Sequence, residues 1–168
     1  MIDYRGIASY LLEAEIAFIL SEDIEGPITG EQVLSKTKWI LPALEIIDSR
    51  YENFAFALLD VIADNTYASR VVFGEKLYSP NEFDLESIEV SMFFNGQKRV
   101  SGVSSEVLGN PENSVAMLAN MLCMNKQQKL NKNTIILTGG ITEAVLLQKG
   151  DHVVTEYAGM NQVSFRIK

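Results

Sequence analysis

Apolar and β-branched residues recur along the chain in runs that have the length of β-strands. Most of these runs lie in the C-terminal half, and turn-forming Gly, Pro and Asn residues separate them. The runs are EAEIAFIL (13–20), IEVSMFF (88–94), TIILTG (134–139), HVVTEYA (152–158) and QVSFRI (162–167). The pattern therefore predicts a strand-rich domain.

Two segments carry the signals of helices. Thr29 and Gln32 have the spacing of a capping box, and the mixed face that follows continues until just before Pro42. Asn110 and Pro111 suit the N-cap and the first position of a second helix. The apolar face of this second helix is predicted to consist of Val115, Leu118, Ala119 and Leu122.

Composition narrows the class of protein. With 168 residues, 47% of them hydrophobic, the chain can form one domain over residues 1–168 with a substantial core. The 14 basic and 22 acidic residues give a net charge of -8 without a Lys/Arg cluster, so we expect neither nucleic acid nor membrane partners. The single cysteine, Cys123, and the lack of a signal peptide predict a cytoplasmic protein.

Carboxylates are the strongest chemical signal. Glu13 and Glu15 are two apart in a predicted strand, so their side chains leave the same face with α-carbons ~6.6–6.8 Å apart. Glu45, between apolar Leu44 and Ile46, is a candidate third ligand. Hard oxygen ligands suit Mg²⁺, Mn²⁺ or Ca²⁺. In the alternative interpretation, the pair lies on a solvated face and Glu45 is the exposed position of a buried strand.

Several separated segments, taken in their order, resemble one known family. They are EAEIAFIL, WILPALEIIDSR, DVIADN, GNPENSVAMLANML, IILTGGITEAV and KGDHV. This order resembles the fumarylacetoacetate hydrolase superfamily, in its branch of 2-hydroxypentadienoate hydratases and 4-oxalocrotonate decarboxylases. The resemblance covers residues 12–167. It implies an α+β fold, in which a curved mixed sheet rolls around the core and a few helices lie outside it.

The resemblance also implies a chemistry. Carried over to this sequence, the metal ligands are Glu13, Glu15 and Glu45, and the metal is Mg²⁺ or Mn²⁺. The substrate is a small 2-keto or 2-hydroxydienoic acid, whose enolate a Lewis-acidic metal would stabilise. We expect a hydratase of the 2-hydroxypenta-2,4-dienoate type in the meta-cleavage catabolism of aromatic compounds. The alternative is a decarboxylase of the 4-oxalocrotonate type.

Other residues have roles by the same resemblance. Asp60 and Asp64 are catalytic candidates that would orient water or a ligand, and the alternative for both is a helix or turn cap. Ser101 belongs to a Ser/Gly-rich segment that matches the family's substrate loop only in part.

The segment LTGGIT resembles the family's contact with the substrate carboxylate. The Thr138 hydroxyl and the backbone N–H groups at Gly139 would bind the anion, whereas the alternative is a turn that ends a strand. Glu143 stands close by in sequence, where its charge would repel a substrate anion unless it points away.

The family has roughly ninety further residues before the Glu-x-Glu strand, including a Lys-Ile-Gly segment that serves substrate binding or proton transfer. We therefore expect this chain to act slowly or not at all by itself, or to be a shortened, non-catalytic metal-binding homologue. We also expect a homo-oligomer with Leu11, Leu12 and residues 54–56 at its contacts.

Overall fold

Two antiparallel sheets form the structure, a computed structural model that describes residues 9–49, 57–126 and 128–168. The five-stranded sheet contains β1 (Ser9–Leu20), β2 (Thr37–Ser49), β3 (Ala68–Phe73), β6 (Ile135–Leu137) and β7 (Val145–Leu146). The four-stranded sheet contains β4 (Glu89–Phe94), β5 (Gln97–Val103), β8 (His152–Tyr157) and β9 (Val163–Arg166). The predicted strand-rich α+β fold is confirmed. The pairings of the described strands are antiparallel rather than mixed.

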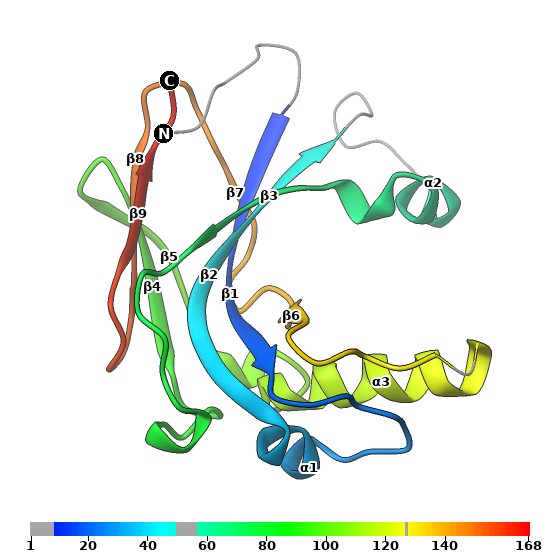
Figure 1. Ribbon diagram of the computed structural model, residues 1–168. Helices are drawn as coiled ribbons and strands as arrows, with labels where there is room; N and C mark the ends of the chain where they lie inside the picture. The colour runs from blue at the N-terminus through cyan, green and yellow to red at the C-terminus, as the bar shows by residue number, and fades with distance from the viewer. Residues whose placement is uncertain (1–8, 50–56, 127) are drawn as a thin grey trace.

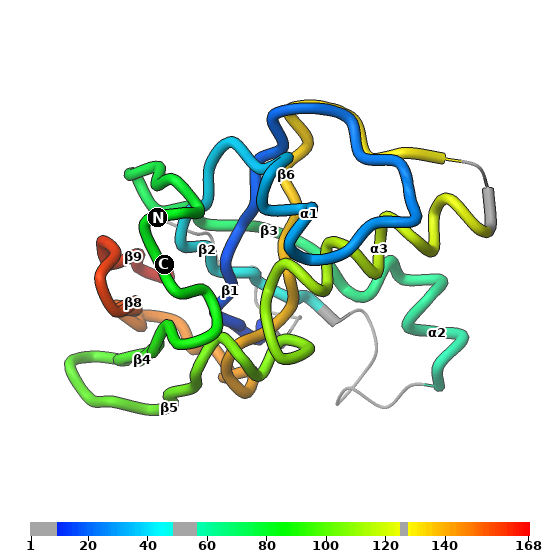
Figure 2. Tube along the Cα trace, turned by 90° about the horizontal axis from the view of Figure 1, so that it is seen from below, coloured from blue at the N-terminus to red at the C-terminus, as the bar shows by residue number. Residues whose placement is uncertain are grey.

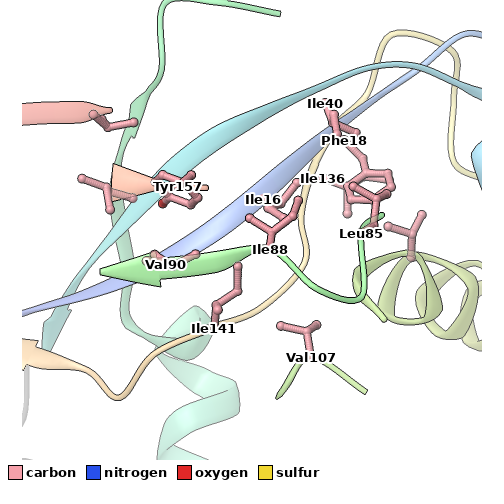
Figure 3. Packing of buried hydrophobic residues seen from close by; sticks show 14 of the residues in the cluster. Ile16, Phe18, Ile40, Leu85, Ile88, Val90, Val107, Ile136, Ile141 and Tyr157 are labelled. Atoms are coloured by element: carbon pink, nitrogen blue, oxygen red, sulfur yellow. The ribbon is translucent and has the colours of Figure 1, made fainter. Parts of the chain in front are cut away.

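The core lies between the two sheets. The first sheet has the order β3-β2-β1-β6, with β7 also on β1, and the second has the order β5-β4-β8-β9. In Figure 1 and Figure 2 the four-stranded sheet lies on one side of β1 and β2 and α2 on the other, while α3 runs past the lower end of β1 and contributes Val115 and Ala119 to the core. Figure 3 shows side chains of both sheets meeting in one apolar cluster, including Ile16, Ile40 and Val90.

The alternation of side chains along β1 places core residues on one face of the sheet and Glu13 and Glu15 on the other. Its even-numbered side chains from Leu12 to Leu20 are fully buried and belong to the main core. Its odd-numbered side chains, among them Glu13 and Glu15, leave the opposite face of the sheet. The expected contact role of Leu12 in an oligomer is therefore wrong, because this side chain is 0% exposed.

The first helix, α1 (Gly30–Ser35), is shorter than the sequence predicts. Its capping box is confirmed, since Thr29 Oγ1 accepts from the N–H of Gln32 and Gln32 Oε1 accepts from that of Thr29. However, Thr37 already begins β2, so a helix that continues toward Pro42 is wrong. The segment from Thr37 contains β-branched and aromatic residues, which favour strands, and it pairs with β1. This pairing outweighs the helical spacing of its polar and apolar positions.

Pro42 lies within β2 instead of after a helix. It stands opposite Ile16 of β1, and the ladder with β3 ends next to it, at the pair Ala43 and Phe73. A proline is tolerated at such a position because its missing N–H falls beyond the last ladder pair.

The second predicted helix is α3 (Pro111–Lys126). Val115 and Ala119 are buried as predicted, but Leu118 is 38% exposed and Ala116 takes its place in the core. The short helices are α2 (Leu58–Ala63), η2 (Asn65–Tyr67), η3 (Pro80–Glu82) and η4 (Ser104–Glu106). Of the helices described, none has the length and apolar character needed to cross a membrane.

Candidate metal centre

Three carboxylates meet on the face of β1 and β2 that points away from the main core. Glu13 stands directly opposite Glu45, and Glu15 stands opposite Ala43, two residues before Glu45. One carboxylate oxygen of each glutamate lies within 4.8 Å of those of the other two. The structure thus brings together the three residues that the sequence singled out. We call Glu13, Glu15 and Glu45 the carboxylate trio.

A glycine-containing loop covers the trio. The N–H of Gly139 donates a 2.7 Å hydrogen bond to Oε2 of Glu15, which is only 1% exposed. At the next residue, a Cβ added to Gly140 would lie 3.1 Å from the carboxylate of Glu13. Glycine therefore allows the backbone to approach both glutamates closely.

Burial and mutual repulsion make the charged state of the trio unfavourable. Burial, and then the charges of Glu45 and Glu13, raise the pKa of Glu15 to about 8, although the Gly139 hydrogen bond partly offsets this rise. Burial and the charge of Glu45 also raise the pKa of Glu13. Like charges directly opposite each other in a sheet are destabilising. The arrangement is therefore costly unless a proton or a cation neutralises it.

A hard divalent cation fits this set of donors. Carboxylate oxygens are the ligands that Mg²⁺ and Mn²⁺ favour, and three of them converge here from two rigid strands. A cation between them would offset both the burial of Glu15 and its repulsion by its neighbours. Glu13, Glu15 and Glu45 are the residues that would hold it.

Thr138 and Gly139, predicted to bind a substrate carboxylate, lie at the trio. The Thr138 hydroxyl is buried and donates to the carbonyl of Ile16 at 2.9 Å, while the Gly139 N–H donates to Glu15. Both donors are thus engaged within the protein and help to hold the loop against β1. Their contact with a substrate stays a prediction.

Asp60 and Asp64 lie outside the trio. Asp60 Oδ2 accepts from the N–H of Ala57 at 2.8 Å and so closes the first turn of α2, which matches the alternative of a helix cap. Asp64 is the C-cap residue of the same helix. Among the described residues, the group of converging carboxylates consists of Glu13, Glu15 and Glu45 and includes neither aspartate.

Ser101 lies on β5, at the rim of a hollow next to the trio. The hollow has a volume of about 610 Å³ and includes Gly140, the residue that packs against Glu13. Glu106 and Glu143 also line it, and both are exposed. Glu143 thus lines the same hollow as Gly140 and Ser101.

Tyr157 is the residue at this site that sequence reasoning missed. Its hydroxyl reaches from the four-stranded sheet to the backbone of β2 beside Glu15. The alternation in HVVTEY indicates an inward side chain, but its partner is a backbone carbonyl, which leaves no trace in the sequence.

Comparison with known proteins agrees with the fold and identifies the family. The model of the family described as fumarylacetoacetate (FAA) hydrolase C-terminal matches residues 4–168. A 4-oxalocrotonate decarboxylase of a Pseudomonas species is 40% identical over 156 residues, which are 92% of this chain and 59% of the relative. A 2-hydroxyhexa-2,4-dienoate hydratase of Comamonas testosteroni is 35% identical over 163 residues, 96% of this chain and 61% of the relative.

A solved structure extends the likeness to three dimensions. The 4-oxalocrotonate decarboxylase from Pseudomonas putida, complexed with magnesium and adipate, has a TM-score of 0.95 and 37% identity. The match covers 99% of this chain and 64% of that one, so the chain spans less than two thirds of these relatives. The sequence match and the shared fold together place this chain in the fumarylacetoacetate hydrolase family, in the branch of hydratases and 4-oxalocrotonate decarboxylases.

Proposed function

We propose that this chain carries the metal-binding part of a lyase that hydrates a small 2-keto or 2-hydroxydienoic acid with one carboxylate. The observation that carries the proposal is the convergence of Glu13, Glu15 and Glu45 beside a hollow that is open to solvent. When bound, Mg²⁺ or Mn²⁺ would supply Lewis-acid stabilisation of the enolate. Magnesium is present in the decarboxylase structure that resembles this one. The alternative activity is decarboxylation, because relatives of both kinds match.

The residues of the chain would contribute position and charge. Rigid pairing of β1 with β2 fixes the three carboxylates, and the Gly139 N–H orients Glu15. Gly140 and Ser101 form part of the wall against which the substrate would lie. Such preorganisation lowers the cost of bringing a substrate into a reactive geometry. We propose the cytoplasm as the location, in keeping with a lone Cys123 that forms no disulfide.

The charge of the hollow bears on the choice between the two activities. Among the described residues that line it, Glu106 and Glu143 are the charged ones, and both are acidic. A substrate with a second carboxylate at its far end would meet repulsion there, whereas a monocarboxylic dienoate would not. The hollow therefore supports hydration of a monocarboxylic substrate over decarboxylation of a dicarboxylic one.

We expect the metal-loaded chain to bind 2-oxopentanoate more tightly than 2-oxoadipate, and to hydrate 2-hydroxypenta-2,4-dienoate faster than it decarboxylates 4-oxalocrotonate. Changing both Glu106→Gln and Glu143→Gln should narrow the difference in affinity by about fivefold, a modest factor because solvent screens exposed carboxylates. Calorimetry with Mg²⁺ gives the affinities, and dienoate absorbance gives the rates.

Glu156→Gln is the matched control for this pair of substitutions. Glu156 is an exposed carboxylate of β8 that lines a different hollow, with Glu89 and Ser91. It should leave the ratio of the two affinities unchanged. A wild-type preference for 2-oxoadipate, or faster decarboxylation, would contradict the hydratase proposal.

Self-association forms part of the proposal. Register places Val71 opposite Glu45, Phe73 opposite Ala43 and Leu146 opposite Leu11, so these side chains share the face of the trio. All three are 38–50% exposed. The predicted residues 54–56 lie outside the described part of the chain, and Leu11 is half-buried.

We expect light scattering at high concentration to give a mass above that of the monomer, because an apolar sheet face of this kind favours association. Phe73→Lys combined with Leu146→Lys should shift the mass toward the monomer, whereas Lys substitution of the exposed Met124 on α3 should not. A wild-type chain that stays monomeric throughout would contradict the prediction.

A further inference from the structure

Tyr157 connects the four-stranded sheet to the two strands that carry the trio. It is the last residue of β8, and its side chain is 2% exposed. Figure 3 shows the ring reaching from its own strand to the ribbons of β1 and β2. Its neighbours in the apolar cluster provide packing, so the hydroxyl is the one part of the side chain that needs a polar partner.

The hydroxyl finds that partner in the backbone of β2, behind the trio. It donates a 2.6 Å hydrogen bond to the carbonyl of Ala43. Ala43 and Glu15 stand opposite each other in the register of β1 and β2. A single buried hydroxyl is thus bonded to the backbone of β2 at the residue that faces Glu15 and lies two positions before Glu45.

The hydroxyl is protonated at neutral pH. Burial, together with the charge of Glu15, raises the pKa of Tyr157 far above its usual range, although the nearby backbone N–H of Glu15 acts in the opposite direction. The phenol therefore keeps its proton and can donate to the carbonyl of Ala43.

We infer that Tyr157 is a positioning residue for the metal centre. It acts from the core side of the sheet by holding the backbone of β2 at Ala43, which lies opposite Glu15 and two residues before Glu45. The inference rests on the proposed metal site. The trio lies on one face of the five-stranded sheet and the ring on the other, so Tyr157 acts through the backbone and touches neither metal nor substrate. Mg²⁺ in particular tolerates little deviation from its preferred ligand geometry.

Tyr157→Phe tests this role, because it removes the hydroxyl and keeps the ring. We expect the affinity for Mn²⁺, followed by the electron paramagnetic resonance signal of the free ion, to fall about tenfold, at the lower end of what outer-shell substitutions cost. Competition by Mg²⁺ should show the same loss. Circular dichroism and thermal unfolding without metal establish that the variant is folded.

Tyr78→Phe is the matched control. Tyr78 is also 2% exposed, and its buried hydroxyl is also hydrogen-bonded: it donates to Oδ1 of Asn161 and accepts from the N–H of Asn161 at 2.6 Å. Both partners of this hydroxyl belong to Asn161, so it makes no bond to Ala43 or Glu15. Tyr78→Phe should therefore lose a similar amount of thermal stability but keep the wild-type affinity for Mn²⁺.

The outcomes distinguish the positioning role of Tyr157 from the existence of the metal centre. If the wild-type chain binds Mn²⁺ and Tyr157→Phe binds it equally well, the positioning role is overturned while the metal centre stands. Equal weakening by Tyr78→Phe would also overturn it, since loss of core stability would then explain both results. If the wild-type chain does not bind Mn²⁺ at all, the proposed metal centre itself is wrong.

Discussion

Replacing Glu15 by Gln is expected to stabilise the metal-free chain at alkaline pH and to abolish its response to Mg²⁺ or Mn²⁺. Wild-type Glu15 is buried among two other carboxylates, so its charge is costly in the folded state. Gln keeps an oxygen for the Gly139 N–H but carries no charge. A single substitution should therefore raise the stability of the metal-free form and eliminate the metal response.

The pH dependence follows from the raised pKa. The pKa of Glu15 is about 8 in the folded chain against 4.5 for the ordinary side chain, so the folded state binds the proton more tightly. Its contribution to stability is fully present below about pH 4.5 and is lost as the pH rises through about 8. The metal-free wild type should thus lose stability over this interval, and Glu15→Gln should lose less.

Thermal and urea unfolding at several pH values, with EDTA or with excess metal, measure both effects. In the wild type, metal at a hundredfold excess over its dissociation constant should add about 2.7 kcal/mol to the unfolding free energy. Glu112→Gln is the control, because Glu112 is also buried with a raised pKa but lies at the start of α3, outside the trio. A Glu15→Gln variant that still responds to metal would contradict the assignment of this ligand.

Gly102→Ala is expected to be the most disruptive small change near the site. A Cβ at Gly102 would lie 2.2 Å from the carbonyl oxygen of Ile141, so the backbone of one segment must move. Ile141 follows the Gly139 and Gly140 pair that packs on the trio. We expect a loss of about 1–3 kcal/mol of stability from overpacking, together with weaker metal binding.

Ser101→Ala provides the comparison, because Ser101 is the exposed neighbour of Gly102 on β5. It should leave the midpoint of thermal unfolding nearly unchanged. If Gly102→Ala unfolds at the wild-type temperature, the close packing of β5 on the Ile141 segment is not a constraint on the fold.

The carboxylate trio could be predicted because its signal is local. Two glutamates two residues apart in a strand share a face by geometry alone. The apolar neighbours of Glu45 made it a candidate third ligand, and the family resemblance pointed to the same residue. The segment from Thr37 was predicted wrongly because its fate depends on a distant partner. Pairing with β1 makes it a strand. That partner lies far away in the sequence, so the local helical spacing gave the wrong end for the helix.

Other features of the site depend on backbone groups and therefore could not be predicted from the sequence. Tyr157 bonds to the carbonyl of Ala43, and Gly102 accommodates the carbonyl of Ile141. Every residue type has such a carbonyl, so a sequence cannot show which one will be close. Asp60 was ambiguous for a related reason, since a cap and a catalytic carboxylate look alike until the N–H of Ala57 is placed.

The facing positions of Glu13 and Glu45 also favour the correct register of β1 and β2 during folding. A slip of β2 by one residue along β1 would turn Glu45 toward the main core and move Leu44 and Ile46, both 0% exposed, to the face of the trio. Burying an unpaired carboxylate among apolar side chains is strongly unfavourable. Misregistered chains are thus penalised twice, by a lost core and by a trapped charge, so the residues proposed to bind metal also select the one alignment of the strands in which they can do so.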